Sequence, residues 1–153
     1  MQTITPFLWF NDDAETVMNY YLSIFPDGKI IQKMPGPEGK PMGGAIELLG
    51  QRLIVLNGGP VHANFTEAIS LFVSVGTQEE IDNYWGKLIA DGGQESQCGW
   101  LKDKYGLSWQ IVPNALGEML GSPDREKANR AMQAMLKMKK IVIADLKKAY
   151  EQE

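Results

Sequence analysis

The feature that most constrains the fold is an internal repeat, in which residues 13–28 recur in type and spacing 64 positions later. Apolar positions match between the two copies, and polar positions match as well. The matching pairs include Glu15 with Glu79, Asn19 with Asn83, Tyr20 with Tyr84, Asp27 with Asp91, and Gly28 with Gly92. A duplicated unit preserves side chains as well as elements, whereas two unrelated amphipathic helices share only their apolar periodicity. We therefore predict two copies of one module.

Each copy reads as one strand, one helix and three further strands. The first copy is expected to place its helix at 13–25 and its strands at 4–10, 30–34, 45–49 and 53–57. The second is expected to place its helix at 77–90 and its strands at 68–75, 95–98, 100–103 and 107–112. Thr77 and Glu80 fit a capping box at the second helix start. The predicted fold class is α+β with two βαβββ modules.

We expect one domain over 1–153, with module one at 1–62, module two at 63–113 and a helical extension at 114–153. Ser122 and Pro123 resemble an N-cap followed by proline at the first helical position. The apolar positions after them predict one long helix over 123–153 with a buried face: Ala128, Ala131, Met135, Met138, Val142, Leu146 and Ala149. This stretch holds eight basic and five acidic residues. It is expected to dock on the acidic body or on a second subunit.

Composition limits the partners. The net charge is -4, so no general field attracts nucleic acid or an anionic membrane, and neither is expected as a partner. The single cysteine, Cys98, cannot form an intramolecular disulfide, which favours the cytoplasm. We expect neither a secretion leader nor a membrane-spanning segment, because no apolar run reaches eighteen residues.

Strand alternation gives the second module two distinct sheet faces. On one face Ile69, Leu71, Val73, Val75, Leu107, Trp109 and Ile111 are expected to pack against helices. On the other lie Ala68, Ser70, Phe72, Ser74, Ser108, Gln110 and Val112. A mixed polar and apolar face suits either a ligand cavity or a plain solvent-facing side, and the pattern alone does not choose between them.

Several segments resemble a known family: 5–10, 56–60, 65–70, 98–100 and 106–113. They are similar to the PhnB-like branch of the vicinal oxygen chelate superfamily, which includes glyoxalase I, bleomycin-resistance proteins and extradiol dioxygenases. The resemblance extends to the Met- and Lys-rich C-terminal helix. It implies a curved mixed sheet around a cleft, often completed by a homodimer. Relatives of this branch are often labelled 3-demethylubiquinone-9 3-methyltransferase-like.

The resemblance also implies where a metal would bind. Metal-dependent relatives take His and Glu ligands from the first and fourth strands of each module. The positions that match are Pro6 and Ser70 in the first strands, Gln110 in the last strand, and either Ile54 or Val55. None offers an imidazole or a carboxylate. We therefore expect no metal and no other cofactor.

The predicted function is to bind or sequester a small organic ligand in the cleft, without a conventional metal site. The residues expected to contact the ligand are Leu8, Phe10, Asn57, Ser70, Phe72, Trp100, Ser108 and Gln110. One alternative is a glyoxalase- or dioxygenase-like enzyme with an atypical metal site built from Glu47, Glu67, His62 or Gln110. Another is an interaction protein that works through its C-terminal helix.

No catalytic residue is assigned. His62 is the one histidine and lies in a Gly- and Pro-bounded loop, and a nucleophilic pair with Cys98 has no third orienting residue. Cys98 is expected to be a small buried residue. A methyltransferase needs a site for S-adenosylmethionine, yet Gly58, Gly59 and Pro60 lead into a loop instead of a helix. The sequence therefore does not support the methyltransferase label.

Overall fold

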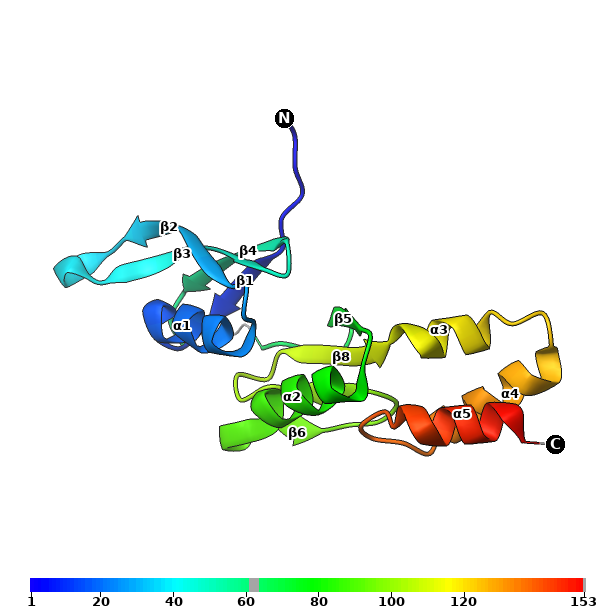
Figure 1. Cartoon of the computed structure of the whole chain (residues 1–153). Helices are drawn as coiled ribbons and strands as arrows, with labels where there is room; N and C mark the ends of the chain where they lie inside the picture. Colours follow the sequence, from blue (N-terminus) through cyan, green and yellow to red (C-terminus); the bar gives the residue numbers. More distant parts are fainter. Residues whose placement is uncertain (61–63, 153) are drawn as a thin grey trace. The chain divides into compact units, whose positions relative to one another are not determined.

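The computed structural model describes residues 1–60 and 64–152. The chain divides into two compact units, with the boundary between Asn64 and Phe65. This boundary lies two residues from the expected boundary between the modules. Each unit contains its own four-stranded sheet and its own helices (Figure 1).

The first unit has the predicted β-α-β-β-β order. It contains β1 (Phe7–Phe10), α1 (Ala14–Ile24), β2 (Lys29–Pro35), a short 3-10 helix (Pro37–Gly39), β3 (Pro41–Leu48) and β4 (Gln51–Asn57). Its four strands lie in the order β1-β4-β3-β2. β1 and β4 are parallel, whereas the pairs β4–β3 and β3–β2 are antiparallel. The sheet is therefore mixed.

The second unit repeats this topology. It contains β5 (Leu71–Val75), α2 (Gln78–Ile89), a 3-10 turn (Ala90–Gly92), β6 (Gln94–Glu95), β7 (Trp100–Lys102) and β8 (Ser108–Pro113). The strand order is β5-β8-β7-β6, with β5 and β8 parallel and the other pairs antiparallel. Because both order and direction repeat, the predicted pair of βαβββ modules is confirmed.

Each module helix buries the stripe that its periodicity predicted. In α1 the side chains of Val17, Tyr21 and Ile24 are buried, and the equivalent α2 residues, Ile81, Trp85 and Leu88, are buried as well. α1 packs on β3 and β4, and α2 packs on β7 and β8. Burying one such side chain stabilises the fold by about 1.5–3 kcal/mol. These two helix-facing layers are the cores of the two units.

Two strands begin later than predicted. β1 starts at Phe7 instead of Ile4, and Ile4 is exposed. β5 starts at Leu71 instead of Ala68, because 66–69 form a turn in which the Thr66 hydroxyl accepts a hydrogen bond from the Ala68 amide at 3.2 Å. Ile69 was expected to pack against helices, but it is 69% exposed on this turn.

The predicted single C-terminal helix was wrong. The extension forms α3 (Asn114–Leu120), α4 (Arg125–Met135) and α5 (Ile143–Glu151), with α4 packed on α5 (Figure 1). The chain leaves helical geometry after Met135 because the carbonyls of Met138 and Lys139 accept hydrogen bonds from the amides of Cys98 and Gly99, at 2.7 and 2.8 Å. The extension is thereby tied to the turn between β6 and β7.

The N-cap of α4 also differs from the prediction. Asp124 is the cap, and its carboxylate accepts a hydrogen bond from the Lys127 amide at 3.2 Å. Ser122 instead accepts hydrogen bonds from the Asp124 amide at 3.2 Å and from the Tyr150 hydroxyl at 2.9 Å, which links the start of α4 to the end of α5. Within the described residues, no helix has the length and apolarity needed to cross a membrane.

Candidate functional site

The two modules differ in the length of their first strand-to-helix connection. In the first unit two residues, Asn11 and Asp12, separate the end of β1 from the N-cap Asp13. In the second unit only Gly76 separates the end of β5 from the N-cap Thr77. The helices therefore match at an offset of 64 residues, whereas the first strands match at 65. A one-residue shift moves every strand side chain to the opposite face.

This shift corrects the predicted positions of Leu8 and Phe10. An offset of 64 pairs Leu8 with Phe72, which lies on the sheet face away from α2. In the structure Leu8 and Phe10 are 6% and 2% exposed, and the Phe10 ring lies 6.1 Å from that of Tyr21 in α1. Both side chains belong to the core and do not line a cavity on the other face. Phe7 and Trp9 occupy that other face.

The face of each sheet that lies away from its module helix is called here the open face. In the second unit, β-pairing sets Phe72, Gln110 and Trp100 side by side in one row across β5, β8 and β7. Phe72 is 57% exposed, and Trp100 and Gln110 are half-buried. A second row, one step along the strands, pairs Ser108 with Lys102. The open face thus presents an amide between two aromatic side chains.

Polar contacts connect each of these rows with the segment before β5. The side-chain amide of Gln110 donates a hydrogen bond from Nε2 to the Ser70 hydroxyl at 3.0 Å. The Lys102 ammonium lies 2.6 Å from a carboxylate oxygen of Glu67, in the turn before β5. That hydrogen bond from Lys102, with help from the Glu67 backbone amide, holds the pKa of the Glu67 carboxyl below its ordinary value of 4.5.

Ser108 carries a buried polar group that is unsatisfied. The residue is 1% exposed, and its hydroxyl makes no hydrogen bond with any part of the chain that the structure describes. A buried hydroxyl without a partner costs about 1–3 kcal/mol, so proteins rarely leave one without a reason. Its position beside Lys102 and two residues from Gln110 directs attention to this face as the candidate site.

A pocket of about 320 Å³ lies at the far end of the same face. Its lining includes Phe72 and Ser74 from β5, Val112 from β8, and residues of the first turns of α3. Ser70, Ser108 and Gln110 do not line this pocket, but Phe72 belongs both to its wall and to the row that contains Gln110. The Phe72 side chain therefore lies between this pocket and the row that contains Gln110.

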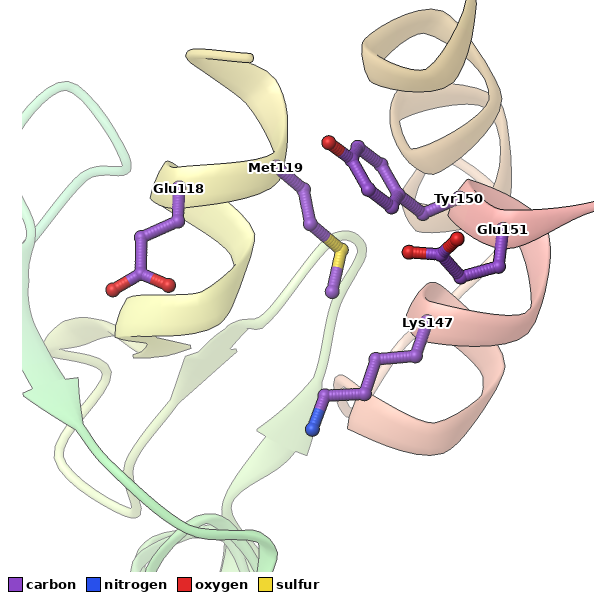
Figure 2. A pocket seen from close by; sticks show the side chains of 5 residues that line it. All are labelled: Glu118, Met119, Lys147, Tyr150 and Glu151. Atoms are coloured by element: carbon purple, nitrogen blue, oxygen red, sulfur yellow. The ribbon is translucent and has the colours of Figure 1, made fainter.

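Two other pockets lie around the C-terminal extension. One, of about 290 Å³, lies between α3 and α5, where Met119 and Lys147 extend toward the space between the helices (Figure 2). Another, of about 430 Å³, is lined by the first residues of α2 and α5. The charged residues of both pockets, Glu118, Lys147 and Glu151, are exposed. Neither pocket has a buried polar group comparable with Ser108, so we place the candidate site on the open face.

The open face of the first unit is apolar at the equivalent positions. Phe7 is paired with Ile54, and Ile54 with Ala45, where the second unit has Phe72, Gln110 and Trp100. The Trp9 indole lies directly over Gly58 and donates a hydrogen bond from Nε1 to the Gly59 carbonyl at 3.4 Å. This face therefore offers apolar surface where the second unit offers hydrogen-bonding groups.

The structure brings together five of the eight predicted ligand-contacting residues: Ser70, Phe72, Trp100, Ser108 and Gln110. The other three belong to the first unit. Leu8 and Phe10 are core residues. Asn57 is exposed at the end of β4, where its side-chain oxygen accepts a hydrogen bond from the Gly59 amide at 3.1 Å.

The strand register also fixes the positions that were compared with metal ligands. The counterpart of Gln110 in the first unit is Ile54, and Val55 faces the core. The counterpart of Ser70 is Thr5 instead of Pro6, because the first strands match at 65. Within the described residues, no three His, Cys, Asp or Glu side chains cluster in a way that could hold a metal ion.

Three further residues, His62, Cys98 and Glu47, were candidates for chemistry. His62 lies outside the described residues. Cys98 is a free thiol that is half-buried instead of buried, and its backbone adopts a positive φ of 59° in the turn that contacts Met138. Glu47 forms an ion pair with Lys29 at 3.4 Å in the first unit.

Sequence reasoning missed Lys102. Strand alternation could have predicted it, because Lys102 follows Trp100 by two residues in a short strand and therefore lies on the same sheet face. Its exposed partner Glu67 was named only as an alternative metal ligand. The contact between them depends on the turn at 66–69, which the prediction assigned to a strand.

The structural comparisons give the fold class. A glyoxalase/bleomycin resistance protein from Albidiferax ferrireducens matches with a TM-score of 0.51 at 14% identity, covering 72% of this chain and 96% of that one. The fosfomycin resistance protein FosX from Listeria monocytogenes, complexed with Mn(II) and sulfate, matches with a TM-score of 0.53 at 14% identity, covering 72% and 89%. The fold is that of the vicinal oxygen chelate superfamily.

The family follows from closer likeness. The model of the family described as 3-demethylubiquinone-9 3-methyltransferase matches residues 2–112, and the chain belongs to this family. A putative 3-demethylubiquinone-9 3-methyltransferase, PhnB protein, from Bacillus cereus is 34% identical, with a TM-score of 0.66, covering 73% of this chain and 99% of that one. The family match ends before α3, so it does not include the C-terminal helices. No curated protein matches the chain.

Proposed function

We propose that this chain binds a small organic molecule on the open face of the second unit. The observation that carries the proposal is the buried, unpartnered hydroxyl of Ser108 beside the row of Phe72, Gln110 and Trp100. Aromatic walls with a few fixed polar groups are typical of small-molecule sites. A ligand that reaches Ser108 would supply the hydrogen bond that the described residues leave unmade.

Gln110 would orient the ligand. Its amide nitrogen donates one of its two hydrogens to Ser70, which leaves the second amide hydrogen and the Ser70 hydroxyl hydrogen as donors and the Gln110 carbonyl oxygen as an acceptor. The pair therefore offers donors and an acceptor side by side. This arrangement suits a neutral or mildly polar group on the ligand and requires no ionised catalytic residue.

The description of the family names a methyltransferase, which needs a place for a methyl donor. The two strand-to-helix connections of the modules, 11–13 and 76–77, contain a single glycine, Gly76, and so differ from a glycine-rich nucleotide-binding turn. This supports ligand binding over methyl transfer as the proposal. Calorimetry with S-adenosylmethionine tests it, since submicromolar binding would favour methyl transfer.

The central test compares Gln110→Leu with Ile54→Leu, a matched change at the equivalent position of the first unit. Protein purified from cells is analysed by native mass spectrometry for retained small molecules. We expect Gln110→Leu to weaken retention by about 1 kcal/mol or more, or roughly fivefold, because a hydrogen-bonding amide is lost. Ile54→Leu should retain the ligand. Equal retention by both variants would contradict the proposed site.

We also propose that the chain works as a homodimer in the cytoplasm. The lone free cysteine suits a reducing compartment, and the exposed Phe7 and Trp9 of the first unit offer apolar surface to a partner copy. Light scattering at micromolar concentration should give twice the mass of the chain. A monomer would contradict the dimer but not the ligand site.

A further inference from the structure

We infer that the ligand of this site carries a carboxylate, which takes the Lys102 ammonium from Glu67 and at the same time bonds the Ser108 hydroxyl. The inference rests on the proposed function and narrows it to anionic organic molecules. It depends on Lys102, which forms an ion pair with Glu67 and is paired across two strands with Ser108, whose buried hydroxyl has no described partner.

Lys102 and Ser108 can serve one anionic group. They are directly paired across β7 and β8, so their side chains leave the sheet side by side on the same face. Residues paired in this way have Cβ atoms about 4.5–5.5 Å apart. A carboxylate has two oxygens, so one can accept from the ammonium and the other from the hydroxyl.

Glu67 fills only half of this arrangement. Its carboxylate bonds Lys102 at 2.6 Å, a charge-assisted hydrogen bond, but it leaves the Ser108 hydroxyl without a partner. A ligand carboxylate on Lys102 that also satisfied Ser108 would make one hydrogen bond more than Glu67 does. The exchange therefore gains one hydrogen bond to a buried group and leaves Glu67 to water.

Glu67 is also easy to displace. Its side chain is 62% exposed on a short turn, and exposed ion pairs contribute little to stability. Once released, the Glu67 carboxylate is hydrated at little cost. Glu67 thus acts as an internal substitute for the ligand's carboxylate and keeps Lys102 in place when the site is empty.

The aromatic row sets the size of the ligand. Ser108 and Gln110 are two residues apart on β8, which corresponds to about 6.6 Å along the strand. A single aromatic carboxylate bridges that distance, with its acid group at Ser108 and Lys102 and its ring beside Gln110, between Phe72 and Trp100. Benzoate is the simplest probe with this shape, and benzamide is its neutral counterpart.

The test measures both probes by NMR, following the side-chain amide of Gln110 in the full chain at fixed ionic strength. We expect benzoate to bind roughly five- to tenfold more tightly than benzamide. Lys102→Met should weaken benzoate roughly tenfold and benzamide by a much smaller factor, because benzamide carries no charge, while Ser108→Ala should weaken benzoate less than Lys102→Met does. Glu67→Gln should strengthen benzoate about threefold, because the competing carboxylate is gone.

A matched control removes the comparable ion pair of the other unit. Glu47 pairs with Lys29 at 3.4 Å, and Glu47→Gln should change neither probe. Equal affinity for benzoate and benzamide, with both weakened by Gln110→Leu, would overturn the carboxylate but keep the site. If neither probe shifts the Gln110 amide at millimolar concentration, both the carboxylate and the proposed site are wrong.

Discussion

The two units keep the same helix-facing layer but differ on their open faces. In the first unit the central row is Phe7, Ile54 and Ala45, and in the second it is Phe72, Gln110 and Trp100. Helix-facing positions are constrained by close packing, where a change of one methylene is felt. Most open-face positions are exposed or half-buried and are less constrained. A repeated module can therefore keep its core and still give one copy a polar surface suited to ligand binding.

The largest change in stability is expected in β1, where substitutions on its two faces show which face belongs to the core. Leu8→Ala should lower the free energy of unfolding by about 3 kcal/mol, because it opens a cavity in the core of the first unit. Phe7→Ala, on the open face, should cost less than half as much despite the larger side chain. Urea denaturation of both variants measures the difference. The reverse order of the two effects would mean that the register of β1 is one residue off.

The same residues show what the sequence could and could not predict. Helical periodicity located α1 and α2, and the matched polar positions revealed the duplication, because both signals are local. Which side chains of β1 face the core depends on the number of residues between the strand and the helix N-cap, which is two in the first unit and one in the second. A single offset of 64 for the whole repeat could not reveal that difference. Strand alternation within the second module placed Ser70, Phe72, Ser108 and Gln110 on one face, whereas Trp100 was named separately.

The rest of the site depended on contacts between distant parts of the chain. The pairing of Lys102 with Glu67 needed the turn at 66–69, where a threonine hydroxyl replaces strand pairing. The break after α4 needed the hydrogen bonds from Cys98 and Gly99 to the carbonyls of Met138 and Lys139. Neither leaves a periodic signal in the sequence.

The turns that precede β4 and β8 are stabilised in different ways. The first is a two-residue turn, Leu49 and Gly50, both with positive φ, and it needs no side-chain support. The second depends on Asp103, which is 2% exposed and accepts hydrogen bonds from the amides of Tyr105 and Leu107 and from Trp109 Nε1.

Asp103→Ala should therefore lower the free energy of unfolding by about 2–3 kcal/mol, since it leaves buried donors unpaired. Asp12→Ala, at an exposed aspartate, should change it by less than about 0.5 kcal/mol. Urea denaturation measures both. Equal midpoints for the two variants would show that the turn before β8 does not need its carboxylate.

A smaller effect of opposite sign is expected at Ser108. In protein freed of ligand, Ser108→Ala should raise the free energy of unfolding by about 1 kcal/mol, because it removes a buried hydroxyl that has no described partner. Ser74→Ala, at an exposed position on the same face, is the control and should stay within about 0.5 kcal/mol. A clear loss of stability in Ser108→Ala would mean that the hydroxyl already has a partner.

The smallest expected change in stability concerns the helix N-caps of the two modules, which differ in whether the capping side chain titrates. Asp13 caps α1 by accepting hydrogen bonds from the Thr16 hydroxyl and amide, at 2.8 and 2.9 Å, and Thr77 caps α2 with a hydroxyl that does not titrate. The bonds from Thr16 hold the pKa of Asp13 below its ordinary 3.8. The charged cap is therefore fully stabilising above pH 3.8, and its contribution is lost as the pH falls through the folded pKa.

Asn also caps helices but carries no charge, so the stability difference between the parent and Asp13→Asn should shrink as the pH is lowered from about 6 to about 2. For Thr77→Ser, the difference from the parent should stay constant over the same range. Urea denaturation across this pH series checks both, and a constant difference for Asp13→Asn would show that the ionised carboxylate is not what caps α1.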